Sequence, residues 1–101
     1  MHTIRLQEPW EKQIAEGVLR WRRWFHAPTG LVPGDMVEIR FEQLAPTARV
    51  TLNGQPIAQS LSAEGWSGWE ITAQLVRRNE VVVEVSADEP LPFRQAVLMI
   101  Q

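Results

Sequence analysis

The chain has 101 residues, the size of a single domain, and hydrophobic residues make up 45% of it, which favours a packed core over disorder. A net charge of −2 provides no broad basic surface for nucleic acid or an anionic membrane, and no run approaches the roughly 20 apolar residues of a membrane span. The sequence contains no cysteine, which excludes disulfides and thiolate metal sites.

The first predicted element is a short strand at residues 2–7. The N-terminal segment has no apolar stretch of the signal-peptide type. We therefore expect a cytoplasmic protein if Met1 is the natural start, and we assign no compartment otherwise.

The next segment, Pro9 to Glu16, fits one or two helical turns. Proline suits the first position of a helix, Trp10 and Ile14 are four residues apart, and Gly17 suits the end of a helix. A longer helix would place Gly17 in its interior at a cost of about 1 kcal/mol. We therefore predict a strand, not a helix, over residues 18–27.

Alternation of apolar and polar residues predicts two central strands, at residues 35–43 and 79–87. In each of them the apolar set shares one face, which we expect to face the core. Val82 lies on the opposite face of the second strand, which indicates that this outer face is partly covered.

A hairpin is predicted at Asn53-Gly54, because both residues tolerate the positive φ angles of a tight turn. It joins strands at residues 47–52 and 55–59. The remaining strands are expected at residues 66–71 and 94–100, with a single turn within residues 71–75.

Many short strands separated by turn residues predict an all-β fold. We expect an antiparallel jelly-roll β-sandwich of about eight strands that forms one domain over residues 1–101. The expected core residues are Trp21, Phe25, Val37, Ile39, Phe41, Val50, Leu52, Ile71, Leu75, Val81, Val83, Val85, Leu98 and Ile100.

Four segments within residues 18–101 carry motifs in a recognisable order. They are RWRRWFHAP (Arg20–Pro28), GDMVEIRFEQLAPTARVTLNGQPIA (Gly34–Ala58), EITAQLVRRNEVVVEV (Glu70–Val85) and PFRQAVLMI (Pro92–Ile100). This order resembles the galactose-binding-like jelly roll, in the form found as the N-terminal sugar-binding domain of family 2 glycoside hydrolases.

The resemblance implies a sugar-binding role without catalysis, since the catalytic carboxylates of that family lie in a separate barrel domain. The sequence departs from the family pattern at two places. Glu70 stands where the family usually has Asp, and the segment Ser60–Gly68 is shorter than the usual Gly-rich aromatic loop.

No motif supports catalysis. The segment from Gly65 to Trp69 comes nearest, but a nucleophile elbow around Ser67 requires glycine at the position of Trp69. Glu38 and Glu42 share one strand face, as do Glu80 and Glu84, and arginines are available as cross-strand partners, which favours a surface of ion pairs over a glycosidase pair. Asp88 and Glu89 read as a charged turn more readily than as a cation site. We expect no enzyme activity, no metal and no cofactor.

The five tryptophans are the most informative feature for function, because flat indole rings bind the apolar faces of sugars. Trp66 and Trp69 are three residues apart, which places them on opposite faces of a strand, so one of them is expected to be exposed. Trp24 shares a face with arginines and either stacks on guanidinium groups or forms a ligand platform. Trp10, Trp21 and one of the loop pair are expected in the core. The candidate ligand-binding residues are Trp66, Trp69, Arg22, Glu70 and Trp24, and we expect the ligand where Trp66 or Trp69 lies near Arg22 or Glu70.

Two hypotheses follow from these patterns. The first is a non-catalytic carbohydrate-binding module with a saccharide as its ligand. The alternative is a protein-interaction or self-assembly domain, whose partner is another protein or a second copy of the chain. Neither nucleic acid nor a membrane is an expected partner.

Overall fold

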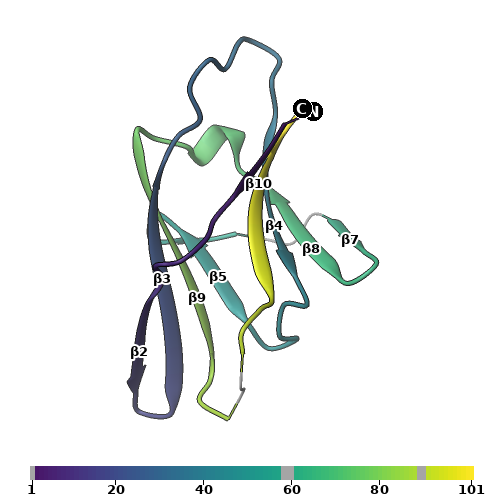
Figure 1. The fold of residues 1–101 in the computed structure, drawn as a ribbon. Helices are drawn as coiled ribbons and strands as arrows, with labels where there is room; N and C mark the ends of the chain where they lie inside the picture. The colour runs from purple at the N-terminus through teal and green to yellow at the C-terminus, as the bar shows by residue number, and fades with distance from the viewer. Residues whose placement is uncertain (1, 58–60, 89–90) are drawn as a thin grey trace.

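The computed structural model describes residues 2–57, 61–88 and 91–101. Ten strands in these residues form two antiparallel sheets of five strands each, which pack face to face as a sandwich (Figure 1). Sheet A has the order β1 (His2–Arg5), β10 (Gln95–Ile100), β4 (Val37–Glu42), β8 (Trp66–Glu70) and β7 (Leu61–Ala63). Sheet B has the order β2 (Glu11–Ala15), β3 (Val18–His26), β9 (Arg78–Ser86), β5 (Arg49–Leu52) and β6 (Gln55–Pro56).

The predicted antiparallel jelly-roll sandwich is confirmed. Eight strands lie at the predicted places, and the expected turn after β8 is the short helix η1 (Thr72–Gln74). Of the predicted 55–59 strand, only Gln55–Pro56 is a strand, and residues 58 and 59 lie outside the described part of the chain. In the described residues no helix is long and apolar enough to cross a membrane.

The predicted helical turns at Pro9 to Glu16 are wrong, because this segment contains strand β2. Glu16 and Gly17 have φ angles of 52° and 77°, so they form a hairpin turn that pairs β2 with β3. Glu64 and Gly65, with φ angles of 51° and 83°, join β7 to β8 in the same way. Asn53-Gly54 forms the predicted hairpin between β5 and β6.

The two sheets meet on a cluster of aromatic side chains centred on Phe93. The ring centre of Phe93 lies 5.0 Å from that of Trp10, 5.3 Å from that of Trp21 and 5.0 Å from that of Phe41. Trp21 comes from sheet B and Phe41 from sheet A, so Phe93 connects the inner faces of both sheets. Phe41 also contacts Trp69 edge-on, with ring centres 5.8 Å apart.

The predicted core is confirmed except at two positions. Leu75 and Ile100 are only partly buried, since each lies at an end of an element. Val82 is 9% exposed on the outer face of sheet B, as its place in the sequence indicates. Several further side chains are buried in connections or beside predicted core positions, and they were not predicted: Leu6, Leu19, Ala45, Phe93, Ala96 and Val97.

Asn79 is fully buried, and its side-chain amide forms hydrogen bonds with β3, with the segment before β9 and with the turn between β5 and β6. Its Nδ2 donates to the backbone oxygens of Val76 at 2.9 Å and Phe25 at 3.5 Å. Its Oδ1 accepts from the backbone nitrogen of Val76 at 2.9 Å and from Nδ2 of Asn53 at 3.1 Å. The Asn53 side chain in turn accepts from the backbone nitrogen of Glu80 at 2.9 Å. All hydrogen-bonding positions of the Asn79 amide are therefore used.

Phe41→Ala is expected to lower the free energy of unfolding by about 3–5 kcal/mol, because it opens a cavity where the sheets meet. Arg49→Ala, an exposed change in β5, is the control and should shift stability by about 0.5 kcal/mol or less. Denaturant unfolding measures both. A loss below 1 kcal/mol for Phe41→Ala would contradict the register of β4.

Asn79→Ala is expected to destabilise the fold by about 2–4 kcal/mol, because it leaves buried backbone and amide groups without partners. The matched control is Arg77→Ala, an exposed position two residues earlier. Thermal and denaturant melts would show whether the two variants differ. Equal stability of the two would mean that the Asn79 hydrogen bonds are replaced by water.

Candidate functional site

The outer face of sheet A is built from the residues that alternate with its core residues. In β4, Val37, Ile39 and Phe41 are fully buried, so Glu38 and Arg40 point away from the core. The antiparallel register extends this alternation to the neighbouring strands β10, β8 and β1.

One row of this face crosses four strands. Arg5 of β1 pairs with Val97 of β10, Val97 pairs with Arg40 of β4, and Arg40 pairs with Gly68 of β8. Val97 is only 5% exposed although it points outward, since the two arginine side chains flank it. The row therefore places one arginine on each side of an apolar residue, Val97.

A shallow groove of about 430 Å³ lies over this row, and we call it the sheet A groove. Trp66 lies at its β8 side, and Glu64 lies beside it in the β7–β8 turn. The groove thus combines a half-buried indole with hydrogen-bonding side chains. Its other lining residues include Thr3, Arg5, Arg40, Gln95 and Met99.

The two arginines of the groove differ in their partners. Arg40 Nη2 bonds to Glu38 Oε1 at 2.9 Å, and Gln101 Nε2 donates to the same oxygen at 3.1 Å. Arg5 is exposed, and no acidic side chain in the described residues forms an ion pair with it. Arg40 is therefore neutralised by an ion pair, whereas Arg5 has none in the described residues, and the remaining charged side chain of the groove, Glu64, lies at the opposite side in the β7–β8 turn.

Gly68 leaves space for the Arg40 side chain. A Cβ atom at Gly68 would lie 3.1 Å from Cγ of Arg40, which is closer than an ordinary contact. Arg40 therefore lies across β8 next to Trp66, the preceding outward residue of that strand. Because glycine carries no side chain, the side chain of Arg40 can lie over its position in the row.

The structure separates Trp66 from Trp69 as the sequence predicts. Trp66 pairs with Glu42 on the outer face and is half-buried, whereas Trp69 pairs with Ile39 on the inner face. Trp69 is 5% exposed and packs against Phe41, so its ring faces are not offered to a ligand. Trp69 is therefore a core residue here, and Trp66 is the member of the pair that lines a groove.

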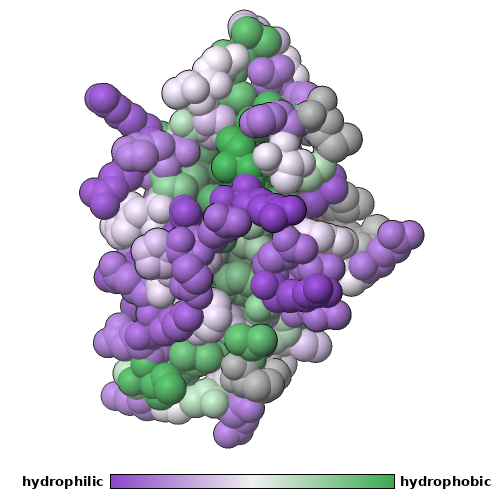
Figure 2. Space-filling view, in the orientation of Figure 1, coloured by the Kyte–Doolittle hydropathy of each residue, from purple (hydrophilic) through white to green (hydrophobic). Residues whose placement is uncertain are grey.

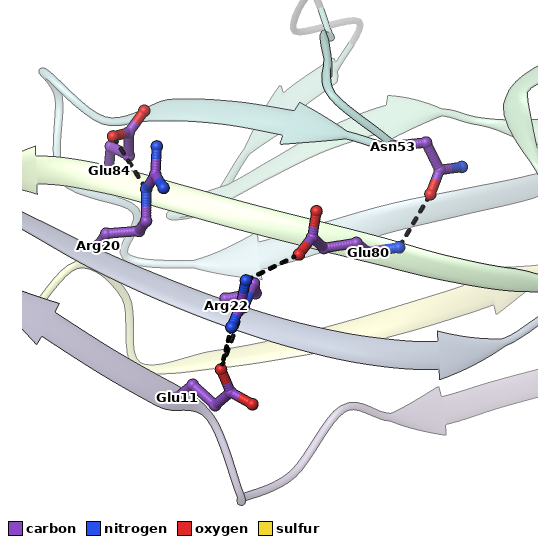
Figure 3. A network of polar contacts seen from close by, with 6 residues as sticks. All are labelled: Glu11, Arg20, Arg22, Asn53, Glu80 and Glu84. Carbon is purple, nitrogen blue, oxygen red and sulfur yellow. Dashed lines mark hydrogen bonds and ion pairs between the residues drawn. The ribbon is translucent and has the colours of Figure 1, made fainter.

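Arg22 does not lie near Trp66, because it belongs to the outer face of sheet B. Figure 3 shows its guanidinium between two carboxylates, with Nε 3.1 Å from Glu11 Oε2 and Nη1 3.4 Å from Glu80 Oε2. The hydrogen bond with Glu11 raises the pKa of Arg22 further above its ordinary value, and Glu80 adds to this. The expected grouping of Arg22 with Trp66 or Trp69 is wrong.

Trp24 and Glu70 have local partners. Trp24 is 41% exposed on the outer face of sheet B, and the Arg78 guanidinium lies 4.5 Å from its ring centre. This is the guanidinium stacking expected as one of the two alternatives for Trp24. Glu70 lies on the outer face of sheet A, where its carboxylate accepts a hydrogen bond from the backbone nitrogen of Thr72 at 2.8 Å.

The outer face of sheet B is a ladder of ion pairs, as the sequence predicts. Arg20 Nε lies 3.2 Å from Glu84 Oε2, parallel to the Arg22–Glu80 pair (Figure 3). Glu80 and Glu84 therefore neutralise arginines of β3. Ser67 lies within strand β8, not at a strand-to-helix turn. In the described part of the chain, no three His, Cys, Asp or Glu side chains gather as metal ligands.

A second hollow of about 440 Å³ adjoins the sheet A groove at the end of β1. The two hollows share Arg5 and Gln95. The floor of the second one consists of the buried rings of Trp10, Trp21 and Phe93. This hollow could not be predicted from strand alternation, since much of its lining comes from two connections, 6–10 and 91–94, that have no strand periodicity.

Exposed apolar side chains gather at the tip of the β2–β3 hairpin. Ile14 is 69% exposed and Val18 is 40% exposed. Figure 2 shows this tip as a hydrophobic patch, and a second one on the loop between β3 and β4. Leu31 and Val32 are exposed in that loop.

The sequence matches no protein-family model and no curated protein. Solved structures are similar to it. An FMN-binding β-glucuronidase from Facaelibacterium prausnitzii L2-6 covers 98% of this chain with a TM-score of 0.79 and 18% identity, over 22% of its own length. A Bifidobacterium dentium β-glucuronidase complexed with coumarin-3-O-glucuronide covers 69% of it with a TM-score of 0.57 and 28% identity, over 12% of its own length.

A glycosyl hydrolase family 2 member from Bacteroides cellulosilyticus DSM 14838 covers 84% of the chain, with a TM-score of 0.64 and 17% identity, over 13% of its own length. The chain therefore spans less than a quarter of each of these proteins. At the level of fold, these matches confirm the resemblance to the galactose-binding-like sandwich domain of family 2 glycoside hydrolases.

Proposed function

We propose that this chain is a non-catalytic carbohydrate-binding module and that the sheet A groove is its binding site. The observation that carries this proposal is the position of Trp66. Its half-buried indole lies in a shallow groove together with Arg40, Thr3 and Gln95.

This combination suits a saccharide. A sugar ring has apolar C–H faces that pack on an indole and hydroxyl groups that need hydrogen-bond partners at its rim. Arg40 and Gln95 supply such partners, and both are held in place by carboxylates. Gln95 Nε2 donates to Glu42 Oε1 at 2.8 Å, and Arg40 is held by Glu38.

The similar solved structures support a role connected with carbohydrates, since their names are those of glycosidases. We propose no hydrolysis by this chain, because Glu38, Glu80 and Glu84 are engaged with arginines and so do not suit the carboxylic acid and free carboxylate that glycosidic hydrolysis requires.

The affinity of such a groove is expected to be weak, in the range from roughly millimolar to micromolar, because the site is open and exchanges water for sugar hydroxyls. Trp66→Ala should weaken binding at least about tenfold by removing the stacking surface. A glycan array followed by titration calorimetry on its hits tests this expectation. Tryptophan fluorescence should also shift when a bound saccharide covers Trp66.

Trp24→Ala is the matched control, because Trp24 is also partly exposed but lies on the outer face of sheet B. It should leave saccharide binding unchanged. A glycan array without hits, or equal loss of binding in both variants, would refute the sheet A groove as a saccharide site.

Self-assembly is the second candidate function, and the exposed edge of sheet B favours it. Strand β2 is exposed along its whole length and pairs only with β3. An unpaired edge with an apolar side chain, Ile14, offers a place for another strand.

If this edge mediates assembly, sedimentation equilibrium should show a dimer, and Ile14→Lys should shift it to the monomer. The control is Val76→Lys, which introduces the same charge at another exposed apolar residue, 55% exposed after η1. A monomer at all concentrations would exclude this candidate.

A further inference from the structure

We propose that the sheet A groove selects an acidic oligosaccharide, one that carries a uronate carboxylate, and that Arg5 binds this carboxylate. The inference rests on the proposed function and defines its substrate class. It follows from the unequal compensation of the two arginines in the groove and from the distance between Arg5 and Trp66.

Arg5 is the charged side chain that favours an acidic ligand. Arg40 already has Glu38 as its partner at 2.9 Å, whereas Arg5 is exposed and has no ion-pair partner in the described residues. A sugar carboxylate is planar and accepts two parallel hydrogen bonds from a guanidinium group, which is the geometry that arginine favours. A neutral sugar forms no ion pair with Arg5, so we expect the β1 side of the groove, away from Glu64, to favour an acidic sugar.

Arg5 and Trp66 lie on strands that are well separated across sheet A. Arg5 lies on β1 and Trp66 on β8, and β10 and β4 lie between them. Three strand spacings correspond to roughly 14 Å between the two backbones. The side chains of Arg5 and Trp66 cover part of this span, and we expect that contact with both takes more than one sugar unit, as in an oligosaccharide lying across the strands.

The neighbouring hollow extends the sheet A groove beyond Arg5. It shares Arg5 with the sheet A groove and carries Lys12 and Arg94 on its walls. Lys12 is paired with Glu8 at 2.9 Å, and Arg94 lies 3.8 Å from Glu42. Arg5 thus lies at the junction of the two hollows and has no ion-pair partner in the described residues. This position suits an acidic unit inside a chain of sugars.

Titration calorimetry with tetrasaccharides of pectate, alginate and hyaluronan tests the proposal. Each tetrasaccharide is compared with its carboxyl methyl ester, which keeps the sugar rings and removes the charge. At least one acid should bind about tenfold or more tightly than its ester, and added salt should reduce this difference. The corresponding uronate monosaccharide should bind more weakly than the tetrasaccharide.

Arg5→Gln should abolish the preference for the acid, so that acid and ester bind with similar affinity, and Arg5→Lys should retain part of the preference. The matched control is Arg49→Gln, because Arg49 is exposed, lacks an ion-pair partner in the described residues and lies on sheet B. Thermal melts verify that each variant is folded.

Three results would overturn the inference. The first is equal binding of acid and ester, and the second is an equal loss of acid and ester binding in Arg5→Gln. The third is a monosaccharide that binds as tightly as the tetrasaccharide. If neutral saccharides bind through Trp66 while no acid is preferred, the proposed function stands and the inference fails. If no saccharide binds in any form, both fail.

Discussion

The register of β4 in the middle of sheet A determines both the core and the outer surface of that sheet. Val37, Ile39 and Phe41 are completely buried, and strand geometry then forces Arg40 outward. A shift by one residue would bury Glu38 and Arg40 and expose Phe41, at a cost far above the stability of a small domain. Burial on one face thus positions the groove on the other.

The sequence predicts the strands well wherever side chains alternate, as in β4 and β9, because a half-buried sheet imposes a period of two. It fails at β2, which is exposed along its whole length and has no apolar face to reveal it. The turns follow the same logic. Asn53-Gly54 was recognisable, whereas Glu16-Gly17 and Glu64-Gly65 adopt similar φ angles without a strong residue preference at the glutamate.

The candidate site was predictable only in part. Strand parity shows that one of Trp66 and Trp69 points outward, but the choice depends on which face of β8 meets Phe41. The alternation of side chains along a strand does not show which sheet the strand joins. Arg22 was therefore predicted near Trp66 or Trp69, although it belongs to the other sheet. The proximity of Arg5 to Arg40 arises because β10, from the far end of the chain, lies between β1 and β4.

The two ends of the described chain lie side by side, since His2 of β1 pairs with Ile100 of β10 (Figure 1). A stretching force applied to these ends would pull β1 away from β10 one residue pair at a time. The four pairs between the strands would open in sequence and would not share the load. Such peeling resists force less than shearing all pairs together, so β1 would detach first under tension and would carry Arg5 away from the groove while the aromatic cluster around Phe93 stayed packed.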